Sequence, residues 1–354
     1  MRFMHVSDVH LGAKPDAGKP WGAKRAQDIW NSFSEAIDRA AEEEVEFLFL
    51  SGDLFHGQPL KKELKEVNYL FEKIPDTRVI LMAGNHDFMH PKSYYRSFEW
   101  ADNVYFFERE EVDFFDFPEE NVCIYGMSYW HREIREALYD NILPKNQNRI
   151  NILLAHGGDE KHIPFSPNRI LQNGFDYIAS GHIHKGGQMV EGKAVMAGAL
   201  EPLDYTDPGP HGYWIGELKK GEACNNLQFI SVKKCEYRQE IVSVTAKDSE
   251  RKLLEAMKEI LRQAPEYQYI RFVLEGYSDP DMSYDFTELE GLGRVVGVVN
   301  QLVPDYNYER LLLENPNTLL GNYIRRMNGM EQNSIRDKAL EYGVNALLGH
   351  QICR

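Results

Sequence analysis

Aspartate, asparagine and histidine side chains recur in five short segments of the chain, each directly after an apolar run. These segments are Asp8-Val9-His10, Gly52-Asp53-Leu54-Phe55-His56, Gly84-Asn85-His86-Asp87, Ala155-His156-Gly157 and Gly181-His182-Ile183-His184. Residues two apart in extended backbone point to the same side, so Asp8 with His10, and His182 with His184, can each bind one centre. The neighbouring glycines allow the backbone to turn sharply and to approach a ligand closely. The pattern therefore predicts one polar site built from distant parts of the chain.

The donor atoms of these segments indicate metal chemistry. Carboxylate, carboxamide and imidazole groups without a thiolate suit borderline metals, and we expect manganese first, with iron or zinc as alternatives. The candidate ligands, too many for one tetrahedral ion and enough for two ions that share a carboxylate, are Asp8, His10, Asp53, Asn85, His156, His182 and His184. Two ions about 3.5 to 4 Å apart can generate a bridging hydroxide for in-line displacement at phosphorus. His86 and His56 remain as candidates to orient the phosphate and to protonate the leaving oxygen.

The elements that must position these side chains alternate between strands and helices. The predicted strands are residues 2–6, 45–50, 78–82, 121–125, 150–154, 177–180, 194–197 and 213–218, and the predicted helices are residues 26–44 and 60–74. Such alternation is typical of a layered α/β domain, here two packed sheets flanked by helices. Ligands of open α/β sheets bind beyond the carboxyl ends of the strands, where all five segments lie.

A second, smaller α/β domain is predicted in the last third of the chain. Its pattern gives a strand at 241–246, a helix at 249–262, a strand at 269–275 and an apolar helix near 289–302. Two short amphipathic helices follow the break at Asn315-Pro316-Asn317. Their apolar stripes, spaced as on one helical face, are Leu320, Ile324 and Met327 on the first and Ile335, Ala339, Tyr342 and Ala346 on the second.

The composition is that of an ordinary folded protein with an acidic balance. The chain has 354 residues, 43% of them hydrophobic, and a formal net charge of −15. This charge would repel a polyanion, so any contact with nucleic acid must be local, metal-assisted or shared with a partner. The chain has no stretch of the roughly 20 apolar residues that a membrane helix needs. Its first residues resemble a strand and a turn rather than a signal peptide, so we expect a cytoplasmic protein without membrane contact.

The cysteines argue against redox chemistry. Cys123, Cys224, Cys235 and Cys353 lie far apart in the chain, and none of them forms a C-x-x-C pair. This usage predicts reduced, mostly buried thiols rather than a disulfide framework or a thiolate metal site.

The five segments resemble the motifs of the calcineurin-like metallophosphoesterases, in the form carried by the Mre11/SbcD-type DNA-repair nucleases and most closely by their bacterial YhaO-like branch. The resemblance implies a four-layer α/β/β/α sandwich with a smaller α/β capping domain and C-terminal helices. It also divides the ligands between the ions. Residues matching Asp8, His10, Asp53 and His184 hold one ion, those matching Asp53, Asn85, His156 and His182 hold the other, and Asp53 bridges them. His86 matches the catalytic histidine, and His56 matches a second histidine that positions the substrate phosphate.

The resemblance further implies a function and domain limits. The activity would be that of a two-metal-dependent DNA nuclease, a 3′–5′ exonuclease and single-strand endonuclease in double-strand break repair. Residues 1–235 would form the catalytic domain, 236–310 the capping domain that guides DNA, and 311–354 the helices that bind the coiled-coil base of a Rad50/SbcC-like ATPase. The capping domain could instead be a stabilising lid or a dimer element, and the helices could simply pack on their own protein.

Two further features bear on substrate and assembly. The segment from Gly12 to Arg25 leaves the Asp8/His10 loop, and Lys14, Lys24 and Arg25 are candidate contacts to a phosphate backbone, although a solvated loop is an equal alternative. Relatives of this kind often form homodimers through helices after the Gly84-Asn85-His86-Asp87 segment. In this chain the aromatic residues of that region, Tyr94, Tyr95, Phe98 and Trp100, are either an interface or, by preference, core.

Two other function classes stay open at this stage. The same core could serve a phosphomonoesterase or a small-nucleotide phosphodiesterase, but protein phosphatases of this fold carry an aspartate and an arginine in the region of Phe55 and His56. The chain could also be a non-catalytic scaffold for an ATPase, although a scaffold has no need of a complete ligand set.

Overall fold

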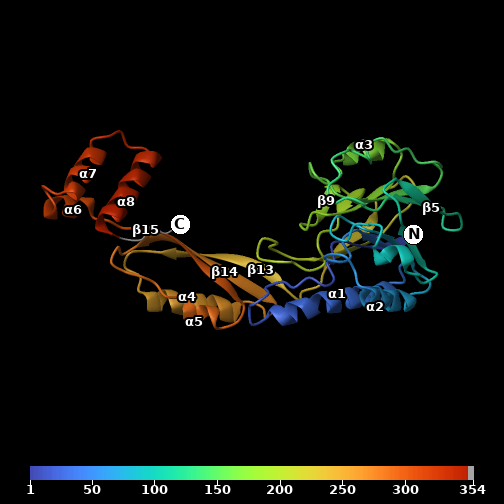
Figure 1. Ribbon diagram of the computed structural model, residues 1–354, viewed down its shortest axis with the longest axis horizontal. Coiled ribbons are helices and arrows are strands. Elements are labelled where there is room, and N and C mark those ends of the chain that lie inside the picture. The colour runs from blue at the N-terminus through green and yellow to red at the C-terminus, as the bar shows by residue number, and fades with distance from the viewer. Residues whose placement is uncertain (350–354) are drawn as a thin grey trace. The chain divides into compact units, whose positions relative to one another are not determined.

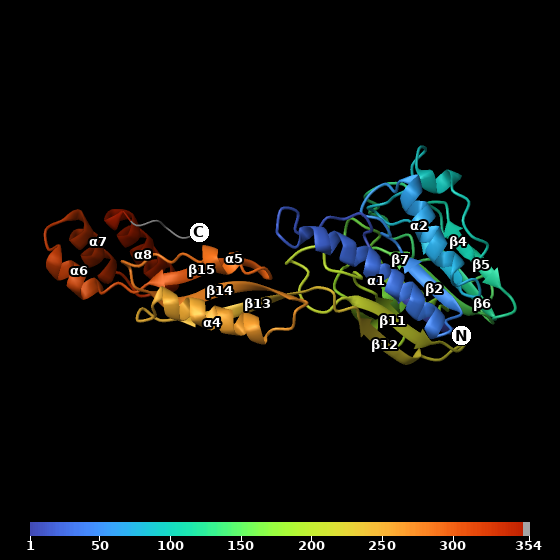
Figure 2. The same cartoon turned by 90° about the horizontal axis from the view of Figure 1, so that it is seen from below.

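The computed structural model describes residues 1–349, and the chain divides into two units, residues 1–237 and a second unit that begins at Arg238. Figures 1 and 2 label the elements of both units. Cys353 and the end of the predicted ATPase-binding segment lie outside the described residues. The functions predicted for the three segments of the chain stay predictions.

The first unit contains two six-stranded sheets. The first has the spatial order β12 (Asn225–Ser231), β11 (Gly212–Glu217), β1 (Arg2–Val6), β2 (Phe47–Ser51), β3 (Arg78–Met82) and β4 (Val104–Phe107). The second has the order β5 (Asp113–Phe117), β6 (Val122–Gly126), β7 (Ile150–His156), β8 (Tyr177–Gly181), β10 (Ala194–Met196) and β9 (Gly187–Val190). Strands β1 to β4 are parallel to one another, as are β6, β7, β8 and β10. The carboxyl ends of the strands that precede the five polar segments therefore meet at one edge of each sheet.

Helices cover the outer faces of both sheets and complete a four-layer α/β/β/α sandwich. The helices α1 (Gly22–Glu42) and α2 (Lys61–Glu72) lie on one side of this unit and α3 (Pro167–Gln172) on the other (Figure 1). One apolar core joins α1 and α2 to the first sheet, a second fills the space between the sheets, and a third joins α3 to the second sheet. This arrangement confirms the predicted fold class.

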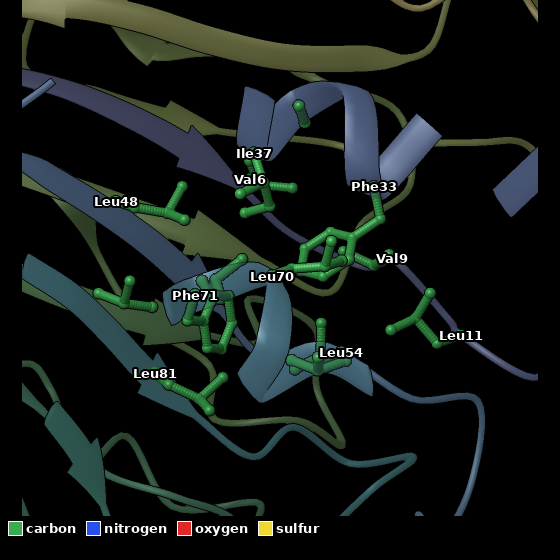
Figure 3. Close-up of a cluster of buried hydrophobic side chains, with 14 of the residues drawn as sticks. Val6, Val9, Leu11, Phe33, Ile37, Leu48, Leu54, Leu70, Phe71 and Leu81 are labelled. Carbon is green, nitrogen blue, oxygen red and sulfur yellow. The ribbon is translucent and has the colours of Figure 1, made fainter. Parts of the chain in front are cut away.

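The core under α1 and α2 follows directly from the sequence pattern. Ile29, Phe33 and Ile37 recur every four residues on α1, so they form one buried stripe against the sheet. In Figure 3 these helices and the strands direct their apolar side chains toward one another, with Phe33 and Phe71 among the labelled residues. Alternate strand residues such as Phe49 point the other way, into the core between the sheets.

The aromatic stretch after the Gly84-Asn85-His86-Asp87 segment belongs mainly to the core. Its backbone is a short 3-10 helix, η1 (Tyr94–Ser97), rather than a longer helix. Tyr95 is buried, and Phe98 and Trp100 pack against the core under α1 and α2, whereas Tyr94 is exposed. The core interpretation therefore holds for three of the four aromatic residues.

The sequence pattern placed most elements of the first unit correctly and missed some. Helix α1 begins at Gly22, four residues earlier than predicted, and the strands β4, β5, β9 and β12 were not predicted. All four are edge strands of their sheets, where exposure on one side weakens the apolar pattern.

The second unit contains a three-stranded sheet, β13 (Glu236–Val244), β14 (Gln268–Ser278) and β15 (Val295–Pro304), with the helices α4 (Glu250–Gln263) and α5 (Thr287–Glu290). The boundary between the units falls within β13. Leu253, Met257 and Leu261 of α4 pack against the sheet, so the predicted stripe of this helix is confirmed in these residues.

The predicted apolar helix near residues 289–302 is wrong. After the end of α5 and a turn at residues 291–294, this region is strand β15, which pairs in parallel with β14, for example Val299 with Val273. The segment Val295-Val296-Gly297-Val298-Val299 consists of β-branched residues and a glycine, which disfavour a helix and favour a strand. A short apolar run does not distinguish the two by periodicity alone.

Three helices, α6 (Tyr308–Glu314), α7 (Leu319–Asn328) and α8 (Ser334–Leu348), end the described part of the chain. The predicted stripe of α7 is buried among these helices. The predicted stripe of α8 is not, because α8 buries Leu340 and Val344 and leaves Ile335 80% and Tyr342 47% exposed. Gly343 faces the Tyr323 ring of α7 so closely that a Cβ would meet it at 2.2 Å, which fixes the buried side of α8.

The remaining sequence expectations concern membranes and thiols. None of the helices within residues 1–349 is long and apolar enough to cross a membrane. Cys123 and Cys235 are buried free thiols, and Cys224 is a partly buried one. Burial raises the pKa of Cys235 to about 12, so this thiol is protonated and unreactive at neutral pH.

A buried ion pair fastens α1 to the segment that follows β10. Arg25 is fully buried, and its guanidinium donates to Glu201 at 3.0 Å and to the carbonyl oxygen of Pro202 at 2.9 Å. Ser32 donates to the other carboxylate oxygen of Glu201 at 2.6 Å. Both charges have lost their water, so each depends on its partners within the protein.

Arg25→Ala should therefore lower the free energy of unfolding of the first unit by about 3–5 kcal/mol, because Glu201 would be left buried without its counter-charge. Lys24→Ala is the matched control: Lys24 pairs with Asp28 at 2.7 Å but its side chain is 60% exposed, so the loss should be about 0.5 kcal/mol or less. Urea unfolding followed by tryptophan fluorescence measures the first unit alone, since all five tryptophans lie within residues 1–237. Equal losses in the two variants would contradict this account.

Candidate metal centre

The two sheets bring the five polar segments together at the carboxyl ends of their strands. The first sheet supplies the loops after β1, β2 and β3, and the second supplies the end of β7 and the loop after β8. Backbone hydrogen bonds hold the first two loops side by side, from Asp8 N to Gly52 O at 3.2 Å and from His10 N to Asp53 O at 3.0 Å. Leu154 packs between the sheets, so His156, two residues later on β7, points toward the first sheet as well.

Several of the candidate ligands have a strained backbone. Asp8, His10, Asp53 and His182 have φ angles of 48°, 53°, 51° and 94°, in the left-handed region that residues other than glycine rarely adopt. Such conformations persist only where the surrounding structure holds them, and they gather at functional sites. The strain turns these side chains inward.

Glycine is required at two positions because the ligands lie against the backbone. A Cβ on Gly84 would meet Asp53 Oδ1 at 2.2 Å and His156 Nε2 at 2.7 Å. A Cβ on Gly52 would meet His156 Nδ1 at 2.3 Å, and Gly52 also has a φ of 93°. The close approach of the backbone predicted for the flanking glycines is therefore an approach to Asp53 and His156.

The first group of ligands consists of Asp8, His10 and His184, whose donor atoms lie within 4.8 Å of one another. The Nε2 atoms of His10 and His184 are 3.0 Å apart. Asp8 and His10 are fully buried, and Asp8 Oδ1 has no hydrogen-bond partner within residues 1–349. An orphaned carboxylate oxygen beside two facing imidazole nitrogens suits a cation.

The second group consists of Asp53, His156 and His182, also within 4.8 Å, and Asn85 joins it. The Asn85 Oδ1 atom lies 2.9 Å from His156 Nε2 and 3.0 Å from His182 Nδ1. His156 Nε2 is 3.4 Å from Asp53 Oδ2. The other oxygen of Asp53 accepts a hydrogen bond from the backbone N–H of His86 at 2.8 Å.

In this second group, one proton on His156 balances the negative charge of Asp53. Burial opposes the charged form of His156, but the Asp53 carboxylate outweighs it and raises the pKa of His156 to about 9. Burial likewise acts against the charge of Asp53, but His156 holds the pKa of this carboxyl well below its usual range. In the first group, burial lowers the pKa of His10 to about 4, so this imidazole is neutral and one of its nitrogens keeps a free lone pair. Metals bind to neutral imidazoles and ionised carboxylates, so His156 would have to release its proton when an ion binds.

The donor set therefore fits divalent metal ions. The predicted ligands fall into two groups that could each hold an ion, and both consist of imidazole and oxygen donors without a thiolate. The identity of the metal does not follow from the donors alone.

His56 and His86 lie on the accessible side of these groups. The His86 ring centre is 4.8 Å from that of His10, and the His56 ring centre is 5.2 Å from that of His86. His56 is exposed and His86 is partly exposed, whereas Asp8, His10, Asp53 and His156 are buried. Burial and the neighbouring His86 lower the pKa of His56.

The predicted basic contacts are only partly available. Lys14 is exposed, and Lys24 is exposed but paired with Asp28. The prediction that Arg25 contacts a phosphate backbone is wrong, because its guanidinium is buried against Glu201 and Pro202. In the sequence its basic neighbours suggested a surface loop, but Arg25 already belongs to the buried stripe of α1.

Two carboxylates beside the site were missed by the sequence analysis. Asp159 accepts a hydrogen bond from His182 Nε2 at 2.8 Å, and Asp207 accepts one from His184 Nδ1 at 2.7 Å. Asp159 comes three residues after His156, so its place in the same loop was a usable signal. Asp207 comes 23 residues after His184, and no pattern in the sequence links the two.

Comparison with known families agrees with this geometry. Residues 1–186, more than half of the chain, match the calcineurin-like phosphoesterase family. The chain belongs to this family. This membership supports a metal-dependent hydrolase that acts on phosphoester bonds.

Curated relatives cover part of the chain. It is 30% identical over 249 residues to the uncharacterized metallophosphoesterase YhaO of Bacillus subtilis, which covers 64% of this chain and 60% of YhaO. It is 28% identical over 212 residues to the DNA double-strand break repair protein Mre11 of Sulfurisphaera tokodaii, covering 54% of this chain and 52% of that protein. The chain thus spans less than two thirds of the length of either relative. A solved structure, a dimetal phosphatase from Danio rerio, is similar with a TM-score of 0.40 and 14% identity over 62% of this chain and 93% of its own.

Gly84→Ala should weaken Mn²⁺ binding about 5- to 150-fold, because the added methyl group displaces Asp53 and His156, and such overpacking costs about 1–3 kcal/mol. Gly57→Ala is the control, since a Cβ at Gly57 meets no atom within 4 Å. Titration of both variants with Mn²⁺ by calorimetry measures the change. Wild-type affinity in Gly84→Ala would show that the close packing around Asp53 is not needed for the site.

Proposed function

We propose that this phosphoesterase is a two-metal-dependent DNA nuclease that hydrolyses phosphodiester bonds. Asp8, His10, Asp53 and His184 would hold one ion, and Asp53, Asn85, His156 and His182 the other. Such a pair of ions, when bound, activates water and neutralises charge on the phosphoryl oxygens. The preferred metal in this proposal is Mn²⁺, with iron or zinc as alternatives.

The observation that carries the proposal is the pair of histidines on the accessible side of the site. His86 and His56 lie next to His10 with ring centres 4.8 and 5.3 Å from it. His10, His56 and His86 bring their donor atoms within 4.8 Å of one another. A histidine can hold a proton for a leaving oxygen at neutral pH, which no carboxylate of ordinary pKa does as well.

The surroundings of these histidines favour a diester over a monoester. Besides burial, the groups that shift the pKa of His56 are His86, Asp53 and His184, none of which is a guanidinium. Phe55, in the region where protein phosphatases of this fold carry a charged residue, is buried in the core. A phosphomonoester carries close to two negative charges at neutral pH, and a guanidinium would suit it better than imidazole rings do. A diester carries one charge.

In this proposal the chain's own residues divide the work. His56 is exposed and contacts a phosphoryl oxygen of the substrate, which orients the phosphate. The Nδ1 atom of His86 lies 3.3 Å from the backbone carbonyl oxygen of His56, which can only accept a hydrogen bond. The His86 ring therefore donates its Nδ1–H to this oxygen. Its Nε2 is then the atom that exchanges a proton with the leaving oxygen, and regains one from water afterwards.

The names of several relatives support DNA as the substrate. Mre11 proteins of Sulfurisphaera tokodaii and Methanococcus maripaludis are described as DNA double-strand break repair proteins, and the second is 29% identical over 262 residues. By this similarity the activities would be 3′–5′ exonuclease and single-strand endonuclease in break repair. The second unit would then contain the capping domain. Lys14 and Lys24, in the segment that follows the Asp8/His10 loop, would contact the phosphate backbone of the DNA.

His86→Ala should lower cleavage of DNA at least 100-fold while both ions remain bound, because it removes a proton donor and no ligand. Asp53→Ala should abolish both cleavage and binding of the ions. The assay uses Mn²⁺ with end-labelled duplex and single-stranded DNA, beside bis-p-nitrophenyl phosphate and p-nitrophenyl phosphate.

His131→Ala is the control for this assay, because His131 is an exposed histidine of the same unit that pairs with Glu110. It should cleave DNA like the wild type. Cleavage of p-nitrophenyl phosphate alone would instead indicate a phosphomonoesterase. Inactivity on every substrate, with both ions bound, would favour a scaffold for an ATPase.

The C-terminal helices are proposed to bind a Rad50/SbcC-like coiled-coil ATPase. The large apolar side chains left exposed on these helices and on the loop between α7 and α8 are Leu313, Leu319, Met330, Ile335, Tyr342 and Leu347. Exposed apolar side chains gathered on a few short helices are typical of protein interfaces. A homodimer would be the competing use of the same surface.

Ile335→Asp combined with Tyr342→Asp should weaken binding of the ATPase at least tenfold, because a charge on the apolar face of α8 must be desolvated on binding. Leu143→Asp is the control, since Leu143 is 66% exposed but lies in the first unit. Calorimetry with the coiled-coil base of the ATPase from the same genome measures the affinity, and sedimentation of the chain alone measures dimer formation. Unchanged affinity together with loss of a dimer would assign this surface to self-association.

A further inference from the structure

The two histidines of the His182-Ile183-His184 segment use opposite ring nitrogens. His182 faces Asn85 with Nδ1 and Asp159 with Nε2. His184 faces His10 with Nε2 and Asp207 with Nδ1. In each ring one nitrogen therefore points into a group of candidate ligands and the other points to a carboxylate outside it.

A carboxylate can only accept a hydrogen bond from these rings. Carboxyl groups are ordinarily ionised at neutral pH, and backbone N–H groups donate to both of these, from Lys161 to Asp159 at 2.8 Å and from Leu203 to Asp207 at 3.2 Å, which stabilises the ionised form. The ring nitrogen that faces the carboxylate must then carry the proton. The other nitrogen keeps its lone pair and can bind a metal ion.

Both carboxylates are themselves held in place. Asp159 accepts hydrogen bonds from His162 Nδ1 at 2.9 Å and from the backbone N–H of Lys161 at 2.8 Å. Asp207 accepts one from the backbone N–H of Leu203 at 3.2 Å, and His211, which lies between Asp207 O and Ala199 O, ties its loop to the first sheet. Two histidines that the motifs did not use, His162 and His211, thus support these carboxylates.

The other two candidate histidine ligands differ in this respect. His156 donates from Nδ1 to the carbonyl oxygen of Ser51 at 2.8 Å, so the backbone holds its ring. His10 Nδ1 is buried without a partner within residues 1–349. Only His182 and His184 therefore depend on side chains that a single substitution can remove.

We propose that Asp159 and Asp207 are positioning residues that set the tautomer and orientation of His182 and His184, one for each ion of the metal centre. This inference rests on the two-ion site of the proposed function. It goes beyond that function because it names separate residues that control the affinity of each ion. Carboxylates hydrogen-bonded to metal-binding histidines commonly contribute about 10–100-fold to metal affinity.

A different role for Asp159 can be distinguished. Asp159, His162 and His182 also have donor atoms within 4.8 Å of one another, so they could hold an ion of their own. The 2.8 Å contact between His182 Nε2 and Asp159 disfavours this, because the same nitrogen cannot donate a proton and bind an ion.

The test is titration of the full chain with Mn²⁺ by calorimetry, with electron paramagnetic resonance to detect a coupled pair of Mn²⁺ ions. Asp159→Ala should weaken the ion at Asp53, His156 and His182 by 10–100-fold, and Asp207→Ala should weaken the ion at Asp8, His10 and His184 to a similar extent. In both variants the coupled signal should give way to that of an isolated ion at intermediate Mn²⁺. Asp159→Asn and Asp207→Asn should restore most of the affinity, because the amide oxygen still accepts the hydrogen bond.

Matched controls are available in the same loops. Glu160→Ala removes an exposed carboxylate next to Asp159, and Asp204→Ala removes one that bonds only Thr206 near Asp207. Both should bind two ions like the wild type, and the melting temperature without Mn²⁺ should be the same in all variants. A lowered melting temperature with equal loss of affinity in the alanine and asparagine variants would mean a structural role and overturn the proposal.

The remaining outcomes also test the positioning role of Asp159 and Asp207. Wild-type affinity for both ions in Asp159→Ala and Asp207→Ala would refute the positioning role, and a third ion lost only in Asp159→Ala would make Asp159 a ligand instead. Fewer than two ions on the wild-type chain would overturn the inference itself. Two ions with the predicted affinities, but no cleavage of DNA, would overturn the proposed nuclease and leave the positioning role standing.

Discussion

The structure of the first unit depends on the burial of charged and polar groups that have few protein partners. Asp8, His10, Asp53 and His156 are at most 1% exposed and face one another rather than apolar side chains. Removing such groups from water is costly unless each finds a hydrogen bond, a counter-charge or a metal. The left-handed backbone of Asp8, His10 and Asp53 and the requirement for glycine at position 84 are consequences, because the ligands can meet only if the chain turns this tightly.

The site is shared between two sheets, so it depends on how they pack. The first sheet contributes Asp8, His10, Asp53 and Asn85, and the second contributes His156, His182 and His184. The core between the sheets, with Phe49 of β2 and Leu154 of β7, fixes their separation. Because protein cores are close-packed, a change of side-chain volume there shifts one half of the ligands against the other. A substitution that disturbs this core should therefore also disturb the geometry of the site.

Chemistry and substrate choice are decided in different places. The buried ligands suit hydrolysis of phosphoesters in general, as family membership implies. The exposed features differ: His56 and His86 at the opening, a few lysines near the Asp8/His10 loop, and a net charge of −15 over the whole chain. An acidic protein that acts on DNA has to hold its substrate through a local surface, a metal ion or a partner. The second unit and the exposed apolar side chains of its last helices are the parts of the chain available for that purpose.

The sequence by itself determined the layered fold and the candidate ligands, because both depend on local patterns. Apolar periodicity marks strands and helices, and the residue types directly after strands mark the site. Tertiary structure decided what such patterns do not contain. Arg25 has a basic neighbour in the sequence, but its partner Glu201 lies far along the chain, so only packing reveals that it is buried. Residues 295–299 are apolar in any conformation, and pairing with β14 selects the strand.

The same distinction holds within the site. The histidines His182 and His184 were evident from their spacing, but the carboxylates that fix their rings were not. Asp207 reaches His184 only because the chain returns to the sheet edge after β10, and His162 approaches Asp159 through a turn. A hydrogen bond needs its two atoms within about 3 Å, and the distance along the chain carries no information on that. The sequence thus determines which residues could bind a metal, and the fold determines which nitrogen of each ring is available for it.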